Sequence, residues 1–435
     1  MRMLKQYSKN INLKLFMALL LMGFVPTIYT TIRTFFIGQL PGDWAYSIAG
    51  QLSWVNLLYE IIDEALILPL FFMLGSPNDD KRSFSNKIKT GVLASGVIYT
   101  VLAIIIIIFA EPMLLLMATG TDILKDSASY IRIESVANIF SIIYRFLLVA
   151  VVALGKDKYV YMLTGAKLIL TVIMDTFLIS NLPFSMGMGV NGIGYSNIIA
   201  NAVLMAIVWT ILKKNGIFEK TETLSFTWFK KFTKIGGISG LESFVRNIAY
   251  MLMVSRMVNM VGEQGTYWVA NNFIWGWMLL PVLQLGELIK HEVSEKEENI
   301  KKCFKGYMVI TTVIILLWII AIPIYKPFMS RILGFDDVDK LFELIMVLFI
   351  PYITFAFQNV FDSIFYGRGR TDYMLFESIV TNFIYYGGMF IAYISNVWTP
   401  SLIGIALMFG IGNIFDAIVS WLAFRHFCRY NLTRK

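Results

Sequence analysis

Long apolar runs separated by short polar segments dominate this chain, a pattern typical of membrane-spanning helices. A span needs about 20 mostly apolar residues, and on that rule the sequence predicts about twelve helices. Six are expected at roughly 13–38, 46–74, 88–110, 127–154, 158–181 and 190–213. Six more follow at roughly 232–260, 265–289, 304–325, 338–366, 371–396 and 400–424. We therefore expect an all-α membrane protein.

The composition supports the membrane class. Of 435 residues, 57% are hydrophobic and only 15% are charged, whereas a soluble domain carries about 25% charged residues. The net charge of +8 comes from basic residues in short loops between apolar runs. That distribution favours the positive-inside pattern over nucleic-acid binding. We expect the lipid bilayer as a partner, and no nucleic acid.

The loop charges also predict topology. Basic segments such as Lys81–Lys89, Gly155–Lys158 and Lys290–Lys305 alternate with acidic or nearly uncharged ones along the chain. Strict alternation puts both termini in the cytoplasm of a multi-pass cell (inner) membrane protein. The widest gap, Lys214–Lys231, mixes lysines with aromatic residues and predicts an interfacial helix. The expected domains are a lobe at 1–213, a linker at 214–231 and a lobe at 232–435.

Two short similarities suggest that the lobes are related. ALGKDKYVYM (Ala153–Met162) follows the fourth predicted span, and GRGRTDYMLF (Gly367–Phe376) follows the tenth. With six helices in each half, such repeats lie parallel, related by an axis along the membrane normal. We expect two pseudo-symmetric six-helix bundles around a central cleft.

Three acids interrupt the second apolar run. Glu60, Asp63 and Glu64, with Asn56, fall at spacings that share one side of a helix. An acid at bilayer depth costs roughly 2.5 kcal/mol or more, so the group should face a partner or a wet cavity. Crowded carboxylates need a proton or a cation between them, which is what an H⁺- or Na⁺-coupled site requires. The alternative, a helix break that leaves them in a loop, is disfavoured by the apolar flanks.

Basic residues are also expected inside the first lobe. Arg33, Arg145 and Lys167 either neutralise the acids of the second span or bind an anionic substrate, since a guanidinium fork suits carboxylate or phosphate. Asp175, in the middle of the fifth span, has a coupling role or forms a structural ion pair with Lys167 or Arg145. Both pairs of alternatives are open from the sequence.

The second half offers fewer candidates. Glu242 and Arg246 are four residues apart and could simply pair with each other. For some further groups, a structural and a functional role are both possible: the acids Asp362, Glu377 and Asp416, and the aromatic residues Trp268, Phe273, Trp275 and Trp277. The aromatic residues either pack in the core or stack on a flat cationic ligand.

Enzymatic readings lack the required residues. The sequence has no GxxxxGK[ST] motif, which weighs against ATP-driven transport within this chain. Two histidines and two cysteines are too few for a plausible metal site. No His/Ser set or paired histidines within the spans suggest hydrolysis. We expect no enzyme activity, no metal and no cofactor apart from H⁺ or Na⁺ as coupling ion.

Several motifs occur in the order found in one transporter family. Tyr29–Leu40 resembles Y-x-x-x-D-x-x-x-x-G-x-L, and LTVIMDTFLI resembles N-x-x-x-D-x-x-x-I, with Asp175 at the acid. GGISGLE resembles G-x-P-x-x-L-E, and GRGRTDY resembles a turn after the tenth span. On these motifs the chain resembles the MATE multidrug exporters. The resemblance implies a monomeric secondary-active antiporter that exports a small organic solute in exchange for H⁺ or Na⁺.

The departures from the family motifs matter. Arg33 stands where the first motif has its acid, and Thr171 replaces the asparagine of the second. We therefore expect Arg33 to pair with an acid of the second span, and the coupling site to have moved. The expected coupling residues are Glu60, Asp63, Glu64 and Asp175; the expected substrate and charge network is Arg33, Asn56, Arg145, Lys167, Glu242 and Arg246. The alternatives are a flippase for a lipid-linked saccharide or an organic-anion exporter with a cationic cleft, and a receptor or channel-like protein.

Overall fold

The computed structural model describes residues 11–40, 44–67, 81–218 and 224–429, and every regular element within them is helical. The elements up to residue 214 are α2 (Leu13–Gly38), α3 (Trp44–Leu66), α5 (Lys81–Leu116), α6 (Leu124–Ala153), α7 (Asp157–Leu178) and α8 (Asn191–Lys214). Those that follow are α9 (Phe229–Tyr250), η1 (Met251–Ser255), α10 (Arg256–Met260), α11 (Gln264–Phe273), η2 (Ile274–Met278), α12 (Leu280–Glu295), α13 (Glu298–Arg331), α14 (Val338–Gly367), α15 (Thr371–Val380), η3 (Thr381–Tyr386), α16 (Gly387–Ile394) and α17 (Leu402–Phe427).

Each of the twelve predicted spans falls on one helix or one run of consecutive helices, which confirms the fold class. In the described ranges nine helices are long and apolar enough to cross a membrane, or ten if the pair bent by 52° between Met278 and Leu280 counts as one span. The predicted end of the second span, 68–74, lies outside the described residues. α5 and α13 are longer than predicted because the helix continues through charged turns beyond its apolar part. In α13, for example, Lys302 Nζ lies 2.5 Å from Glu298 Oε2, one turn earlier on the same helix.

Among the described residues, three helical runs contain a π-helical segment of five or six residues, and sequence periodicity predicted none of them. η1 joins α9 to α10, η2 follows α11, and η3 joins α15 to α16. A π-helical turn hydrogen-bonds from residue i to residue i+5 and is rare outside short bulges. Each π-helical segment therefore changes the direction in which the following side chains point, compared with an uninterrupted α-helix of the same number of residues.

The predicted interfacial helix at 214–231 does not form as one element, and the prediction is wrong for residues 215–218 and 224–228. Residues 215–218 and 224–228 are turns and irregular backbone, and α9 begins only at Phe229. The aromatic side chains pack on one another instead, with Trp228 and Phe232 ring centroids 5.1 Å apart. Trp228 Nε1 donates to Thr90 Oγ1 on α5 at 3.0 Å. These contacts hold the segment against α5, so the aromatic residues mark a packing contact.

The chain divides by packing into two compact units. Unit 1 comprises Met1–Thr31 and Ile248–Lys435, and unit 2 comprises Ile32–Asn247. Both boundaries fall inside continuous helices, α2 and α9. This partition follows contacts and does not coincide with the lobes expected from the repeat, 1–213 and 232–435, which remain a prediction.

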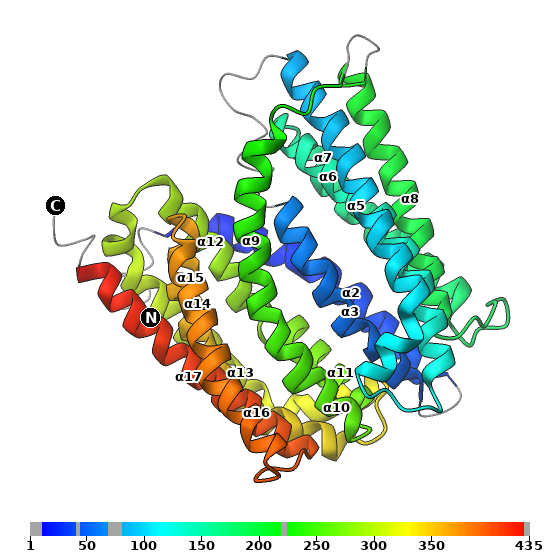
Figure 1. Cartoon of the computed structure of the whole chain (residues 1–435), viewed down its shortest axis with the longest axis vertical. Coiled ribbons are helices and arrows are strands. Elements are labelled where there is room, and N and C mark those ends of the chain that lie inside the picture. Colours follow the sequence, from blue (N-terminus) through cyan, green and yellow to red (C-terminus); the bar gives the residue numbers. More distant parts are fainter. Residues whose placement is uncertain (1–10, 41–43, 68–80, 219–223, 430–435) are drawn as a thin grey trace. The chain divides into compact units, whose positions relative to one another are not determined.

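Small residues allow close helix packing within each unit. In unit 2, α6 packs against α5 and α8 (Figure 1). A Cβ atom at Gly91 of α5 would lie 2.1 Å from the Phe146 ring of α6. In unit 1, α14 packs against α12, α13 and α17, and a Cβ atom at Gly410 would lie 2.6 Å from Pro351. Such contacts are how helices associate in a bilayer, where water provides no driving force between them.

Candidate functional site in unit 2

A buried ion pair joins the end of α2 to α7. Arg33 Nε and Nη2 donate to the two carboxylate oxygens of Asp175, at 2.8 and 3.0 Å. The two side chains are 11% and 1% exposed. A bidentate guanidinium–carboxylate contact is strong and geometrically specific. It neutralises the charge of the acid that the sequence had marked for ion coupling.

The same guanidinium begins a longer polar chain. Arg33 Nη2 also donates to Asn197 Oδ1 on α8 at 3.1 Å, and Asn197 Nδ2 donates to Glu134 Oε1 on α6 at 2.7 Å. Glu134 is 3% exposed and also contacts Tyr130. The sequence interpretation did not single out Glu134. Its position inside the apolar range 127–154 was the signal that could have found it, because any acid within a span is a candidate.

One prediction about an ion pair is therefore wrong, because Arg33 does not pair with the acids of the second span. Of the alternatives left open for Asp175, an ion pair does form, but its partner is Arg33 and not Lys167 or Arg145. Helical spacing identifies the face on which a residue lies but not the neighbouring helix that this face meets. Here α2 places its guanidinium against α7, where both Asp175 oxygens can accept.

A second ion pair holds Asp63 of α3. Arg145 Nη1 of α6 donates to one Asp63 oxygen, and the Tyr99 hydroxyl of α5 donates to the other. The Asp63 side chain is 14% exposed, whereas Arg145 is 46% exposed. Asp63 is thus directed toward α5 and α6, away from its two acidic neighbours in sequence.

The third cluster contains more acids than bases. Arg246 of α9 lies 2.6 Å from Glu64 and 3.3 Å from Glu60, both on α3. Its Nε lies 3.5 Å from Glu242, so the predicted pair within α9 also forms. Glu242 is only 5% exposed, and the other three side chains are 27–41% exposed. One guanidinium therefore serves three carboxylates.

Gly240 explains why α3 and α9 can share this cluster. A Cβ atom at that position would lie 3.0 Å from Ala65 Cβ and 3.5 Å from the Ile61 carbonyl oxygen. The helices approach closely at the glycine, and the Glu60 and Glu64 side chains then reach Arg246. The predicted shared face of α3 thus holds for Glu60 and Glu64, whereas Asp63 contacts other helices.

Two predicted site residues are not joined to these clusters. Asn56 is exposed, one turn before Glu60. Lys167 of α7 lies over the Tyr144 ring, with Nζ 5.8 Å from the centroid, and forms no ion pair with any described residue. A cation over an aromatic face is stabilised by the ring quadrupole, although less than by a carboxylate.

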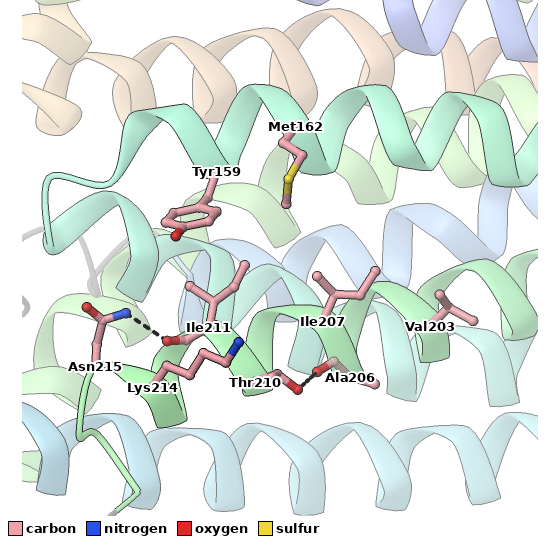
Figure 2. Close-up of a pocket in the computed structure, with 9 residues that line it drawn as sticks. All are labelled: Tyr159, Met162, Val203, Ala206, Ile207, Thr210, Ile211, Lys214 and Asn215. Atoms are coloured by element: carbon pink, nitrogen blue, oxygen red, sulfur yellow. Dashed lines mark hydrogen bonds between the residues drawn. The ribbon is translucent and has the colours of Figure 1, made fainter.

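Two cavities have mostly apolar walls. One, of about 530 Å³, lies between α7 and α8, and Lys214 is the one charged residue that lines it (Figure 2). Thr210 and Asn215 in its wall donate to the carbonyl groups of Ala206 and Ile211. In unit 1, Phe273 and Trp277 line a cavity of about 700 Å³ that has no acid in its wall. Trp277 Nε1 donates to Thr31 Oγ1 at 3.0 Å, and Trp275 packs against Phe355. The predicted aromatic stripe is therefore split between a cavity wall and core packing.

Comparison with known proteins places the fold. No family model and no curated protein matches the sequence. An inward-facing multidrug resistance MATE family transporter of the MOP superfamily is 18% identical, with a TM-score of 0.69 over 91% of this chain and 97% of that one. A Vibrio cholerae MATE transporter is 14% identical, with a TM-score of 0.67 over 100% of both chains.

A third similar structure is described by the polarity of its binding pocket. It is a MOP superfamily transporter from Pyrococcus furiosus, 16% identical, with a TM-score of 0.67 over 99% of this chain and 98% of that one. Its binding pocket is described as having reversed polarity, suggesting a different function. The present chain is thus a multi-pass membrane protein with the fold of MATE transporters of the MOP superfamily, which confirms the predicted resemblance at the level of the fold.

Proposed function

We propose that this protein is a secondary-active antiporter that exports an organic solute across the cell membrane in exchange for H⁺ or Na⁺. Its termini lie in the cytoplasm, as the basic loops predict. Two lobes expose a central cleft to one side of the membrane at a time. The fold supports transport as the general activity, and the clusters of unit 2 support ion coupling.

The observation that carries the proposal is the excess of acids around Arg246. Among the ion pairs between described residues, Glu60, Glu64 and Glu242 all meet one guanidinium, so three carboxylates share a single positive charge there. Uncompensated charge away from bulk water is costly, so the cluster gains from binding a proton or a sodium ion. Glu60 and Glu64 are partly exposed and are the groups such an ion can reach.

The other predicted coupling acids are already matched by bases. Asp175 accepts two hydrogen bonds from Arg33, and Asp63 accepts from both Arg145 and Tyr99. Neither needs a further cation. We therefore assign ion coupling to Glu60, Glu64 and Glu242, and structural roles to Asp63 and Asp175.

Ion binding at Glu64 changes the strength of its contact with Arg246. When Glu64 is protonated or binds sodium, it no longer attracts the guanidinium at full strength, and the contact between α3 and α9 weakens. An ion that binds one conformation better than the other shifts the equilibrium between them by that difference. In the cycle we propose, an ion from outside favours substrate release outward, and its discharge into the cytoplasm restores substrate binding.

An organic-anion or lipid-linked saccharide cargo is the second candidate, and Lys167 supports it. This lysine has no acidic partner among the described residues and lies on an aromatic ring. The Pyrococcus furiosus transporter, whose binding pocket is described as having reversed polarity, also supports this candidate. Against this, Arg33, Arg145 and Arg246 each contact a carboxylate, which leaves little free cationic surface for a phosphate.

The test is transport by the purified full-length protein in liposomes, with an imposed pH or sodium gradient. Ethidium is the cationic probe and carboxyfluorescein the anionic one. We expect gradient-driven ethidium movement to fall about fivefold or more in Glu64→Gln and Glu60→Gln, the scale of a typical coupling free energy. Asp126→Asn, which alters an exposed acid of unit 2, should transport like wild type.

Two outcomes would contradict the proposal. Unchanged gradient dependence in the Glu60→Gln/Glu64→Gln double variant would remove the coupling role of the cluster. Movement of carboxyfluorescein alone, lost in Lys167→Gln, would instead establish the anionic cargo. Asp63→Asn and Asp175→Asn belong in the same series, because a selective loss of coupling in either would return the role to those acids.

A further inference from the structure

Three acids come together in unit 1, far along the chain from the cluster just described. Asp362 lies on α14, Glu377 on α15 and Asp416 on α17, and these three helices pack against one another. Glu377 is 2% exposed, while Asp362 and Asp416 are partly exposed. The sequence left the role of all three open. Their convergence on one place follows from the packing of the last three spans.

Neutral donors surround two of the acids. Ser420 Oγ donates to Asp362 Oδ1 at 2.6 Å. Gln358 Nε2 and Thr381 Oγ1 donate to the two oxygens of Asp416, also at 2.6 Å. Every polar contact to these two carboxyl groups thus comes from an amide, a hydroxyl or Glu377.

Glu377 lacks a hydrogen-bond donor for one of its carboxylate oxygens. It lies in hydrogen-bonding range of Asp362 and Ser420. Its Oε1 atom is buried without a hydrogen-bond partner. Two carboxylates cannot bond to each other without a proton, because both only accept. A buried acceptor that lacks a donor is costly, so this contact requires a hydrogen that the protein itself does not supply.

No basic side chain compensates for the three acids within the described part of unit 1. The charged groups that face the cluster are its own members, from α14, α15 and α17, and η3 adds only neutral groups such as Thr381. Three charged residues of α12 and α13, which pack against α14, have partners elsewhere. Lys290 of α12 pairs with Glu287, Lys302 of α13 pairs with Glu298, and Glu292 accepts from the Tyr307 hydroxyl.

We propose that Asp362 and Glu377 form a proton-binding site, in which one proton lies between the two carboxyl groups and is exchanged with water through Asp362. Binding converts one carboxylate to the acid, whose O–H donates to the other carboxylate. No other bond changes. Among the described residues no set of acids, cysteines and histidines has the arrangement of a metal site, which favours a proton over a metal ion. The site does not depend on the coupling proposed for unit 2.

The experiment is infrared difference spectroscopy on the full-length protein in lipid nanodiscs, between neutral and alkaline pH, in H₂O and D₂O. We expect wild type to show a carboxylic-acid C=O band at neutral pH that shifts in D₂O and disappears at alkaline pH. Glu377→Gln should lose this component. Asp362→Asn should lose it as well, because either amide supplies the N–H that replaces the shared proton and leaves the remaining acid ionised.

Glu343→Gln is the matched control, since it alters an exposed acid on the same helix, α14. It should keep the component. Absence of any protonated-carboxyl band in wild type would overturn the proposal without reliance on variants. A band that persists in both Glu377→Gln and Asp362→Asn would also overturn it, because the proton would then belong to other acids. Neither result would decide the coupling role of Glu60 and Glu64, which is read from transport.

Discussion

In unit 2, Asp63 and Asp175 each pair with an arginine, whereas in unit 1 the carboxyl groups of Asp362, Glu377 and Asp416 face, among the described residues, hydroxyls, amides and one another. An arginine stays protonated at every physiological pH, so its neutralisation of an acid is permanent. A proton can leave. One fold thus has two ways to neutralise acids within its spans: the fixed charge of an arginine at Asp63 and Asp175 and, in our proposal, an exchangeable proton between Asp362 and Glu377.

The sharpest way to break this comparison is to remove the fixed charge. Arg33→Gln leaves Asp175 buried without its cation, and breaking a buried pair in this way costs about 3–5 kcal/mol. The double variant Arg33→Gln/Asp175→Asn should recover most of that loss, because no unpaired charge remains. Denaturant unfolding in mild detergent, analysed as a double-mutant cycle, measures both effects. Additive costs for the two substitutions would mean that the pair is not coupled.

An intermediate loss of stability is expected when one of the neutral donors to Asp416 is removed. Thr381→Val removes one hydrogen bond to Asp416 and should lower the unfolding free energy by about 1 kcal/mol if the acceptor is neutral. Thr312→Val is the control, because its hydroxyl bonds only to the Met308 carbonyl of its own helix. A loss of about 3 kcal/mol for Thr381→Val would indicate an ionised Asp416 and would weaken the contrast between the units.

The smallest effect is expected at the exposed arginine of unit 2. Arg145 contacts Asp63 but is 46% exposed, and exposed ion pairs contribute about 1 kcal/mol or less. Arg145→Gln should therefore destabilise far less than Arg33→Gln, measured under the same conditions. Equal losses for the two variants would show that burial does not set the strength of these pairs.

The sequence predicted the spans well because span length and hydropathy are local properties. α2 begins and ends at the predicted residues, and α14 and α17 differ from their predicted bounds by a few residues. The residues of the unit 2 clusters were also mostly anticipated, since charged groups inside apolar runs are conspicuous. Glu134 is the exception, although the same criterion applied to it.

The partners of those residues could not be predicted. Arg33 was expected to meet α3 and meets α7 instead, and Asp63 lies away from Glu60 and Glu64 despite their adjacent positions. Which helices are neighbours is a property of the whole bundle. The aromatic segment before α9 shows the same limit, because the side chains of an interfacial helix and those of a packed turn have the same composition.

The π-helical segment η3 (Thr381–Tyr386) lies directly between α15, which carries Glu377, and α16. Deleting one residue there would let the run close as an ordinary α-helix. An α-helix turns about 100° per residue, so an extra residue in an ordinary helix would rotate every following side chain by that angle. The wider π-helical turn takes up such a residue locally. A residue can therefore be gained or lost within this segment while the side chains of α16 keep their direction relative to Glu377.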